Sequence, residues 1–152
     1  MFYSKLKYGI TSWGSCPKTT LDPIIKLQKR AIRYISFKPC RTPTLPLFAE
    51  LNMLKLIDVH KLEICKLINK MTKINLNGEL NLIKLENKHK YPTRLSLNDN
   101  YYFTPVRTNL GKTGFNSIAP NFWQNVPTEF KSLNFSLFPK KYKHYLVGLY
   151  NI

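Results

Sequence analysis

Four cationic side chains lie close together on one face of a predicted helix. They are Lys26, Lys29, Arg30 and Arg33. Because an α-helix has about 3.6 residues per turn, these positions fall within about a third of its circumference. Ammonium and guanidinium groups in such a stripe can contact successive phosphates of a polyanion. A solvated surface face explains the same pattern, so both interpretations stay open on the sequence alone.

Cationic and aromatic residues are also interspersed in the second half of the chain. Arg94, Arg107 and Lys112 supply donors for phosphate, and the rings near them can stack on unpaired bases. Those rings are Tyr91, Tyr101, Tyr102, Phe103 and Phe115. Packing in a hydrophobic core is the competing role for most of them. Lys140 and Lys143, on the outer face of the last predicted helix, complete the predicted nucleic-acid-binding set.

The sequence shows no group of residues arranged for catalysis. Metal-dependent polymerases and nucleases need converging carboxylates, whereas Asp22, Asp58 and Asp99 are isolated. Asp22 and Asp58 stand where helix N-caps are expected, which favours a structural role. The three histidines have no evident carboxylate or thiol partner. We therefore expect no catalytic residues, no metal ion and no cofactor.

The tripeptide Gly111-Lys112-Thr113 is similar to the end of a nucleotide-binding phosphate loop. That loop requires a glycine five positions before Gly111, where this chain has Val106. A nucleotide-hydrolase role is therefore excluded. Gly111, Lys112 and Gly114 form either a basic turn whose amides meet a phosphate or a plain surface turn.

Composition agrees with a polyanionic partner. The 152 residues include 24 Lys and Arg against 8 Asp and Glu, a formal charge of +16 whose self-repulsion a polyanion would relieve. Nucleic acid and an anionic membrane surface both qualify. No apolar stretch is long enough to span a membrane, and no signal-peptide pattern is visible. Three widely spaced cysteines indicate reduced thiols, so we expect an intracellular protein of nucleus or cytoplasm without membrane association.

Helical periodicity is clearest in the first half of the chain. Phe2, Leu6, Ile10 and Trp13 recur at helical spacing, with a stop at Gly14. The next helix is predicted from Leu21, with Pro23 in its first turn. Its apolar face is formed by Leu21, Ile24, Ile25, Ala31, Ile32 and Ile35, opposite the cationic stripe.

Two further helices are predicted before residue 75. After a proline-rich turn, a short apolar-faced helix contains Leu47, Phe48, Leu51 and Leu54. A longer helix follows, with Asp58 as its N-cap and a hydrophobic staple between Ile57 and Leu62, and runs to about Thr72. It is expected to bury Ile57, His60, Ile64, Leu67, Ile68 and Met71, and to end before Asn77-Gly78.

The rest of the chain is less regular until its last residues. Residues 79–130 are rich in Asn, Thr, Pro and Gly, so we expect irregular structure with short strands near Tyr101–Arg107. A C-terminal helix is predicted at about 136–150, with Phe138, Tyr142, Tyr145, Leu146 and Leu149 aligned. The expected fold is mainly α: one basic domain over 1–152, a small helical bundle that is helical over 1–75 and irregular over 76–130.

The order of several motifs resembles one known family. The opening motifs are Tyr3-Ser4-Lys5-Leu6-Lys7-Tyr8-Gly9-Ile10, Trp13-Gly14 and Leu27-Gln28-Lys29-Arg30-Ala31-Ile32-Arg33. Further matches are Thr44, Leu47-Phe48, Leu54-Lys55-Leu56, Tyr91-Pro92-Thr93-Arg94, Pro105, Arg107-Thr108, Gly111-Lys112, Pro120, Trp123, Val126-Pro127, Phe138, Tyr142 and Tyr145-Leu146. This order is similar to the region after the thumb in jockey-like retrotransposon reverse transcriptases, which lack long terminal repeats.

Two small departures accompany the resemblance: Gln124 where the family usually has Asn, and Val126-Pro127 where it has Leu-Pro. The resemblance covers no endonuclease, fingers, palm or catalytic aspartates, so it implies a non-enzymatic piece of an RNA-directed DNA polymerase. It also implies that the chain holds template RNA or target DNA, with the polymerase core of a related element as another partner. The basic role is carried to Lys29, Arg30, Arg33, Arg94, Arg107 and Lys112, whereas Trp123 and Pro127 are expected to fix the local fold.

Three alternatives remain beside nucleic-acid binding. A longer relative would polymerise nucleotides. A non-functional remnant, or a structural module for a missing thumb, would expose the face of Phe2, Leu6, Ile10 and Trp13. A membrane-associated chain would bind anionic liposomes without competition from nucleic acid.

Overall fold

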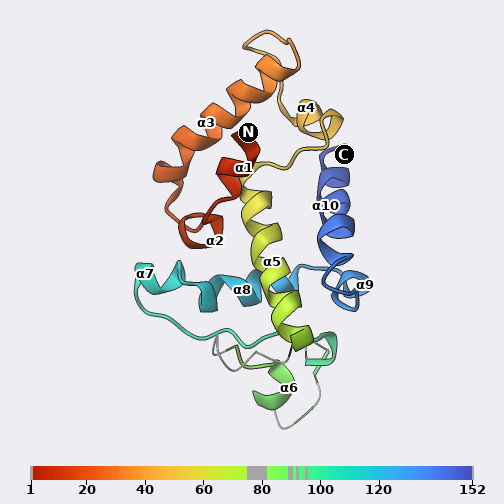
Figure 1. Cartoon of the computed structure of the whole chain (residues 1–152). Helices are drawn as coiled ribbons and strands as arrows, with labels where there is room; N and C mark the ends of the chain where they lie inside the picture. Colours follow the sequence, from red (N-terminus) through yellow and green to blue (C-terminus); the bar gives the residue numbers. More distant parts are fainter. Residues whose placement is uncertain (1, 75–81, 89–90, 92, 95, 152) are drawn as a thin grey trace. The chain divides into compact units, whose positions relative to one another are not determined.

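The computed structural model describes the chain except residues 1, 75–81, 89–90, 92, 95 and 152 (Figure 1). The described residues are mainly helical and contain no sheet, which confirms the predicted mainly α fold class. The α-helices are α1 Phe2–Lys7, α2 Ile10–Trp13, α3 Lys18–Ile35, α4 Leu45–Glu50, α5 Leu56–Ile74, α6 Leu85–Lys88, α7 Asn109–Lys112, α8 Phe115–Gln124, α9 Thr128–Lys131 and α10 Phe138–Gly148. The short 3-10 helices are η1 Ser96–Asn98 and η2 Leu149–Asn151.

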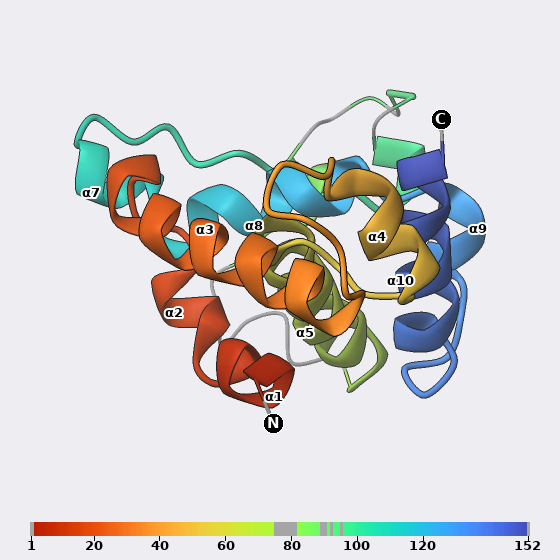
Figure 2. The ribbon, with the colours of Figure 1, turned by 90° about the horizontal axis from the view of Figure 1, so that it is seen from above.

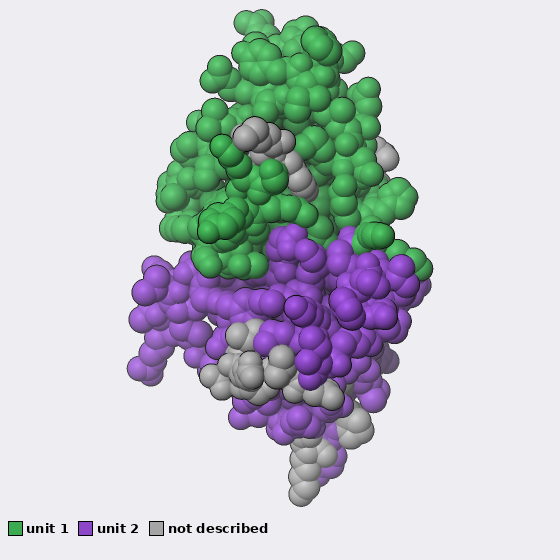
Figure 3. Space-filling model, in the orientation of Figure 1, with its two compact units in different colours: residues 1–62, 140–152 green, residues 63–139 purple. Residues whose placement is uncertain are grey.

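The chain divides into two compact units, coloured separately in Figure 3. Unit 1 comprises Met1–Leu62 and Lys140–Ile152, and unit 2 comprises Glu63–Pro139. The two chain segments of unit 1 come from opposite ends of the sequence. The prediction of a single domain stays a prediction.

The first predicted helix is two helices in the structure. Gly9 adopts a left-handed conformation with φ of 60°, which ends α1 and precedes α2. Glycine takes this conformation without the steric penalty that a Cβ atom imposes. Leu6 and Ile10, one on each side of the break, are both buried. The helical spacing of apolar residues was therefore correct, but the prediction of one continuous helix was wrong.

Helix α3 begins at Lys18, three residues earlier than predicted. Extended Pro17 precedes it, so Pro23 lies inside the helix rather than in its first turn. Asp22 is likewise an exposed residue within α3, and the N-cap prediction for it was wrong. Leu21 and Ile32 are buried as expected, whereas Ile35 is exposed.

Helix α5 also begins before the predicted residue. The Lys55 carbonyl already accepts the Val59 amide at 2.9 Å, so Asp58 lies in the first turn and is not the N-cap. Ile57 is 56% exposed, which removes the predicted staple with Leu62, and Leu67 is also exposed. The other predicted core positions are buried or half-buried, and the helix continues to Ile74. Asn77-Gly78 lie outside the described residues.

Helix α4 forms part of the core of unit 1. It packs against α3 and against η2, an arrangement visible in Figures 1 and 2. Leu47 and Phe48 are buried, as predicted for this short helix. The rings of Phe48 and Tyr150 meet edge to face with centroids 6.4 Å apart. The C-terminal residues thus pack onto a helix that precedes them by about a hundred positions.

The C-terminal helix confirms most of its predicted face. Phe138, Tyr142 and Leu146 are buried in α10. Tyr145 and Leu149 are partly exposed, and Val147 and Tyr150 are buried in their place. At Leu149 the chain switches to a 3-10 helix, which changes the angle between successive side chains, so Tyr150 is buried where Leu149 was expected.

Unit 2 is more helical than the sequence indicated. Residues 115–124 form α8 with Pro120 inside it, although this segment was predicted to be irregular. The predicted strands near Tyr101–Arg107 are also wrong, because the described pairing is a single antiparallel bridge between Lys84 and Tyr101. Buried Trp123 of α8 packs against Phe138, with ring centroids 5.9 Å apart. That contact ties α8 to the start of α10.

Candidate nucleic-acid interface

The predicted cationic stripe is an exposed face of α3. Lys26, Lys29 and Arg30 are exposed and have no hydrogen bond or ion pair with any residue that the structure describes. Arg33 is half-buried, and its Nε donates to the Thr42 carbonyl at 2.9 Å. The stripe therefore has three free cations and one guanidinium that is anchored to the loop after the helix.

A buried glutamine positions α3 against the rest of unit 1. Gln28 is 1% exposed and lies on the helix face opposite the stripe. Its Nε2 donates to the Leu54 carbonyl, and its Oε1 accepts the Leu56 amide, each at 2.9 Å. Leu56 is the first residue of α5, so its amide has no partner within that helix. Gln28 thus holds the stripe-bearing helix and caps α5 at the same time.

The C-terminal residues provide a second cap for α5. The Tyr150 hydroxyl accepts the Lys55 amide at 3.2 Å and donates to the Asp58 carboxylate. The Lys55 ammonium also lies over the Tyr150 ring, 4.4 Å from its centroid. Asp58 at the positive end of a helix is favoured electrostatically. Asp58 is thus a structural carboxylate, although by a different contact from the predicted N-cap.

In two of the pockets of unit 1, most of the lining residues are basic. One, of about 70 Å³, lies at the C-terminal end of α3 and is lined by Arg30, Arg33, Tyr34, Lys38 and Cys40. The other is a groove lined by Asn52, Lys140, Lys141, Lys143 and His144. The structure therefore brings two predicted arginines together in one pocket and two predicted lysines together in another. Lys38, Lys141 and Asn52 were absent from the predicted set.

Positive charge is concentrated in unit 1. Its sequence contains 14 Lys and Arg against 3 Asp and Glu, a net charge of +11, whereas unit 2 contains 10 against 5, a net charge of +5. With so few carboxylates, most cations of unit 1 have no acidic partner to neutralise them. An anionic ligand is therefore attracted most strongly to unit 1.

The predicted cations of unit 2 line none of the described pockets. Arg94, Arg107 and Lys112 are all exposed, Lys112 at the end of α7 and the arginines outside helices. Among the rings near them, Tyr91 and Phe103 are exposed, whereas Tyr101 is 1% exposed. The core interpretation therefore holds for Tyr101, which is unavailable to a base.

The amides of the predicted basic turn are already bonded. Gly111 donates to the Thr108 hydroxyl at 3.1 Å and Gly114 to the Gly111 carbonyl at 3.1 Å. The Lys112 and Thr113 amides also donate to carbonyls of the same turn. A Cβ atom at Gly111 would lie 2.1 Å from the Val106 side chain, which explains the glycine there. This segment is therefore a close-packed turn and not an amide cradle for phosphate.

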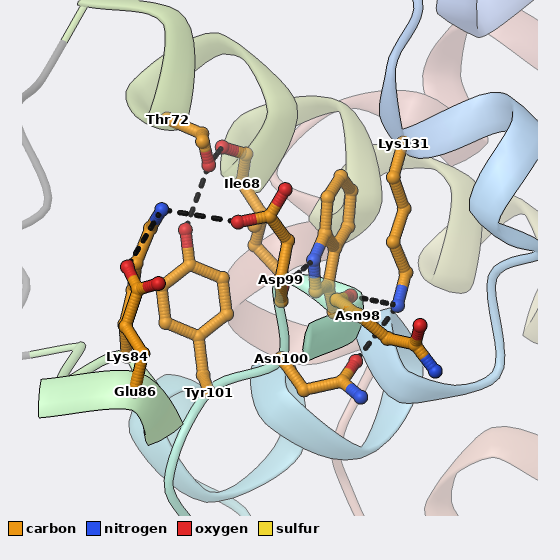
Figure 4. Close-up of polar contacts among 10 residues, drawn as sticks. Ile68, Thr72, Lys84, Glu86, Asn98, Asp99, Asn100, Tyr101 and Lys131 are labelled. Atoms are coloured by element: carbon orange, nitrogen blue, oxygen red, sulfur yellow. Dashed lines mark hydrogen bonds and ion pairs between the residues drawn. The ribbon is translucent and has the colours of Figure 1, made fainter. Parts of the chain in front are cut away.

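A polar network holds the central segment of unit 2 (Figure 4). Lys131 is 8% exposed and donates to the Asn98 carbonyl at 3.1 Å and to Asn100 Oδ1 at 2.7 Å. Trp123 Nε1 donates to the Asp99 carbonyl at 2.8 Å, which agrees with the structural role expected for this residue. Burial lowers the pKa of Lys131, so its charge is tolerated through these contacts rather than hydration.

The neighbouring ion pairs complete this network. Burial acts to lower the pKa of Lys84, but Asp99 and Glu86, at 3.1 and 3.3 Å, raise it overall. The Tyr101 and Thr72 hydroxyls are hydrogen-bonded at 2.7 Å, and burial raises the pKa of Tyr101. These contacts fasten the segment that carries them.

The described part of the chain contains neither a candidate metal cluster nor a candidate membrane-spanning helix. Its His, Cys, Asp and Glu residues form no group of three or more that could hold a metal ion. Outside the masked positions, every helix is too short or too polar to cross a lipid bilayer. No protein-family model, curated protein or solved structure matches the chain.

Proposed function

We propose that this chain is a non-catalytic nucleic-acid-binding module that contacts the phosphates of RNA or DNA through unit 1. The observation that carries the proposal is the row of free, exposed cations on α3, in a unit with a net charge of +11. Binding would release counterions from the polyanion, which supplies affinity without recognition of sequence. Lys140 and Lys143 form a second group of cations within the same unit.

The dimensions of the stripe fit a phosphate backbone. Lys26 and Arg30 are four residues apart, which corresponds to a rise of about 6 Å along the helix. Each strand of duplex DNA presents a phosphate about every 3.4 Å along its axis. The three free cations can therefore contact neighbouring phosphates at the same time. Gln28 supports this arrangement, because it fixes the opposite face of α3 in the core.

The resemblance to the region after the thumb of jockey-like reverse transcriptases supports a more specific form of the proposal. In that form the ligand is template RNA or target DNA, and a polymerase core of a related element is a second partner. We propose no reaction for this chain. Incubation of the purified chain with template, primer, nucleotides and divalent metal tests this statement. The proposal expects no incorporation of nucleotides.

The alternative of a remnant that once packed on a thumb rests on an exposed apolar face near the N-terminus. Leu6 and Ile10 are 7% and 1% exposed. Because both residues are buried, these two positions do not support that alternative. Binding of a dye that reports open apolar surface would favour it.

A comparison at equal net charge tests the proposal. One variant replaces Lys26, Lys29 and Arg30 by Gln, and its control replaces the exposed residues Lys70, Lys73 and Lys88 of unit 2 by Gln. Both lose three positive charges. The proposal expects the first variant to bind labelled RNA and DNA at least about 10-fold more weakly than the control in fluorescence anisotropy. Equal affinities would show that bulk charge, and not the α3 stripe, determines binding.

A further inference from the structure

Two exposed aromatic residues belong to the chain segment that forms the cationic pocket at the end of α3: Tyr34 lines the pocket, and Phe37 precedes the lining residue Lys38. Phe37 is 95% exposed and Tyr34 is 69% exposed. In Figure 1 the loop that follows α3 extends past the end of that helix. Isolated apolar side chains on a surface are common, but these two rings accompany three cations within nine residues of sequence. That combination is the one that single-stranded nucleic acid uses, with phosphates on cations and bases on rings.

The backbone holds Phe37 in its exposed position. Its φ of 51° is left-handed, an uncommon conformation for a residue with a Cβ atom. The Lys38 amide donates to the Arg33 carbonyl at 3.0 Å, and the Phe37 amide donates to the Tyr34 carbonyl at 3.2 Å. These two bonds form a Schellman cap. They also occupy carbonyls that would otherwise oppose an anion at this helix end.

The pocket suits a small anion. It is lined by Arg30, Arg33, Tyr34, Lys38 and Cys40, and its volume of about 70 Å³ equals that of two or three water molecules. Arg33 Nε is fixed on the Thr42 carbonyl, which orients the remaining guanidinium donors. A phosphate group fits such a space, but a whole nucleotide does not. A bound nucleotide must therefore keep its base outside the pocket, where the exposed part of the Tyr34 ring and the Phe37 ring are open to it.

We propose that the C-terminal end of α3 is a subsite for single-stranded nucleic acid, with a phosphate in the pocket of Arg30, Arg33 and Lys38 and unpaired bases stacked on Phe37 and Tyr34. This inference rests on the proposed nucleic-acid function and adds a preference for unpaired strands. Duplex bases are stacked on one another, so their faces are closed to a protein ring. The rings therefore contribute to binding of single strands alone.

The test uses the full chain and three labelled probes: oligo-uridine, oligo-thymidine and duplex DNA. Phe37→Asn removes the ring and leaves the charge unchanged, and asparagine tolerates the left-handed conformation. We expect affinity for both single strands to fall about 5- to 100-fold, with less than a twofold change for the duplex. Comparison of the two single strands shows whether the 2′-hydroxyl of RNA adds to the interaction.

Two control variants separate the subsite from general effects. Tyr8→Ser removes an 87% exposed ring from another part of unit 1 and should leave all three affinities unchanged. Lys18→Gln removes a charge at the far end of α3, about 18 Å from Arg30 along the axis, and should weaken all three probes equally. Circular dichroism verifies that each variant keeps its helices.

Phe37→Trp provides an independent readout within the folded chain. It restores a ring, so it should bind single strands like the unchanged chain, and stacking should quench its added fluorescence. Single-strand affinity that is unchanged in Phe37→Asn would overturn the inference but not the proposed function. Absence of any nucleic-acid binding by the unchanged chain would overturn both.

Discussion

Replacement of Gln28 by leucine tests the clamp that positions the cationic helix. Leucine has a similar size and suits the buried site, so the change removes hydrogen bonds and little packing volume. Two backbone groups then lose their partners, the Leu54 carbonyl and the Leu56 amide, each bonded at 2.9 Å. Both residues are almost fully buried, at 0% and 2% exposure, so water cannot replace the lost bonds.

An unpaired buried backbone group costs about 1–3 kcal/mol, and improved burial of an apolar side chain offsets part of the total. We therefore expect Gln28→Leu to lower the free energy of unfolding by about 2–4 kcal/mol. Urea titration followed by circular dichroism measures this value. Lys29→Gln is the matched control, because Lys29 is exposed on the next position of α3 and should change stability by less than about 0.5 kcal/mol. A Gln28→Leu chain as stable as the control would refute the clamp.

Three further predictions concern packing, two of them in unit 1 and one in unit 2. Gly14→Ala should destabilise the chain by about 1–3 kcal/mol in urea titration, since a Cβ atom there would lie 2.5 Å from both the His60 ring and the Ile10 carbonyl; unchanged stability would contradict this packing. Burial lowers the pKa of His60. The unfolded chain therefore binds more protons below about pH 6.5, and stability should fall between pH 7.5 and 5, a dependence that His60→Gln should reduce. Trp123→Phe should cost about 1–2 kcal/mol, because it leaves the Asp99 carbonyl without its 2.8 Å bond; thermal unfolding checks this, and an unchanged midpoint would count against the network.

The long helices could be predicted because their signal is local. In α3 and α5, apolar residues recur every three or four positions. This period arises because one face of each helix packs on the core and the other faces solvent. Their first residues could not be predicted in the same way. The amides at the start of α5 are bonded to Gln28 and Tyr150, 28 and 95 residues away from their partners, so Asp58 was mistaken for the cap.

The candidate site was predicted in part for the same reason. Lys26, Lys29 and Arg30 follow the helical period, and the structure places them on one exposed face. Gln28 interrupts the apolar face, so its role as a buried clamp could not be seen in hydrophobic periodicity. Phe37 is apolar, so its residue type suggests a place in the core. In the structure it lies in the left-handed turn after α3 and is exposed.

The dependence of duplex DNA binding on salt tests the central claim most directly. If about eight cations contact phosphates, the logarithm of the binding constant should fall against the logarithm of salt concentration with a slope of about −7. Replacement of Lys26, Lys29 and Arg30 by Gln should reduce the slope to between about −4 and −5, since each lost contact removes about 0.9. A slope near zero, or one that this triple replacement leaves unchanged, would contradict phosphate binding by the α3 stripe.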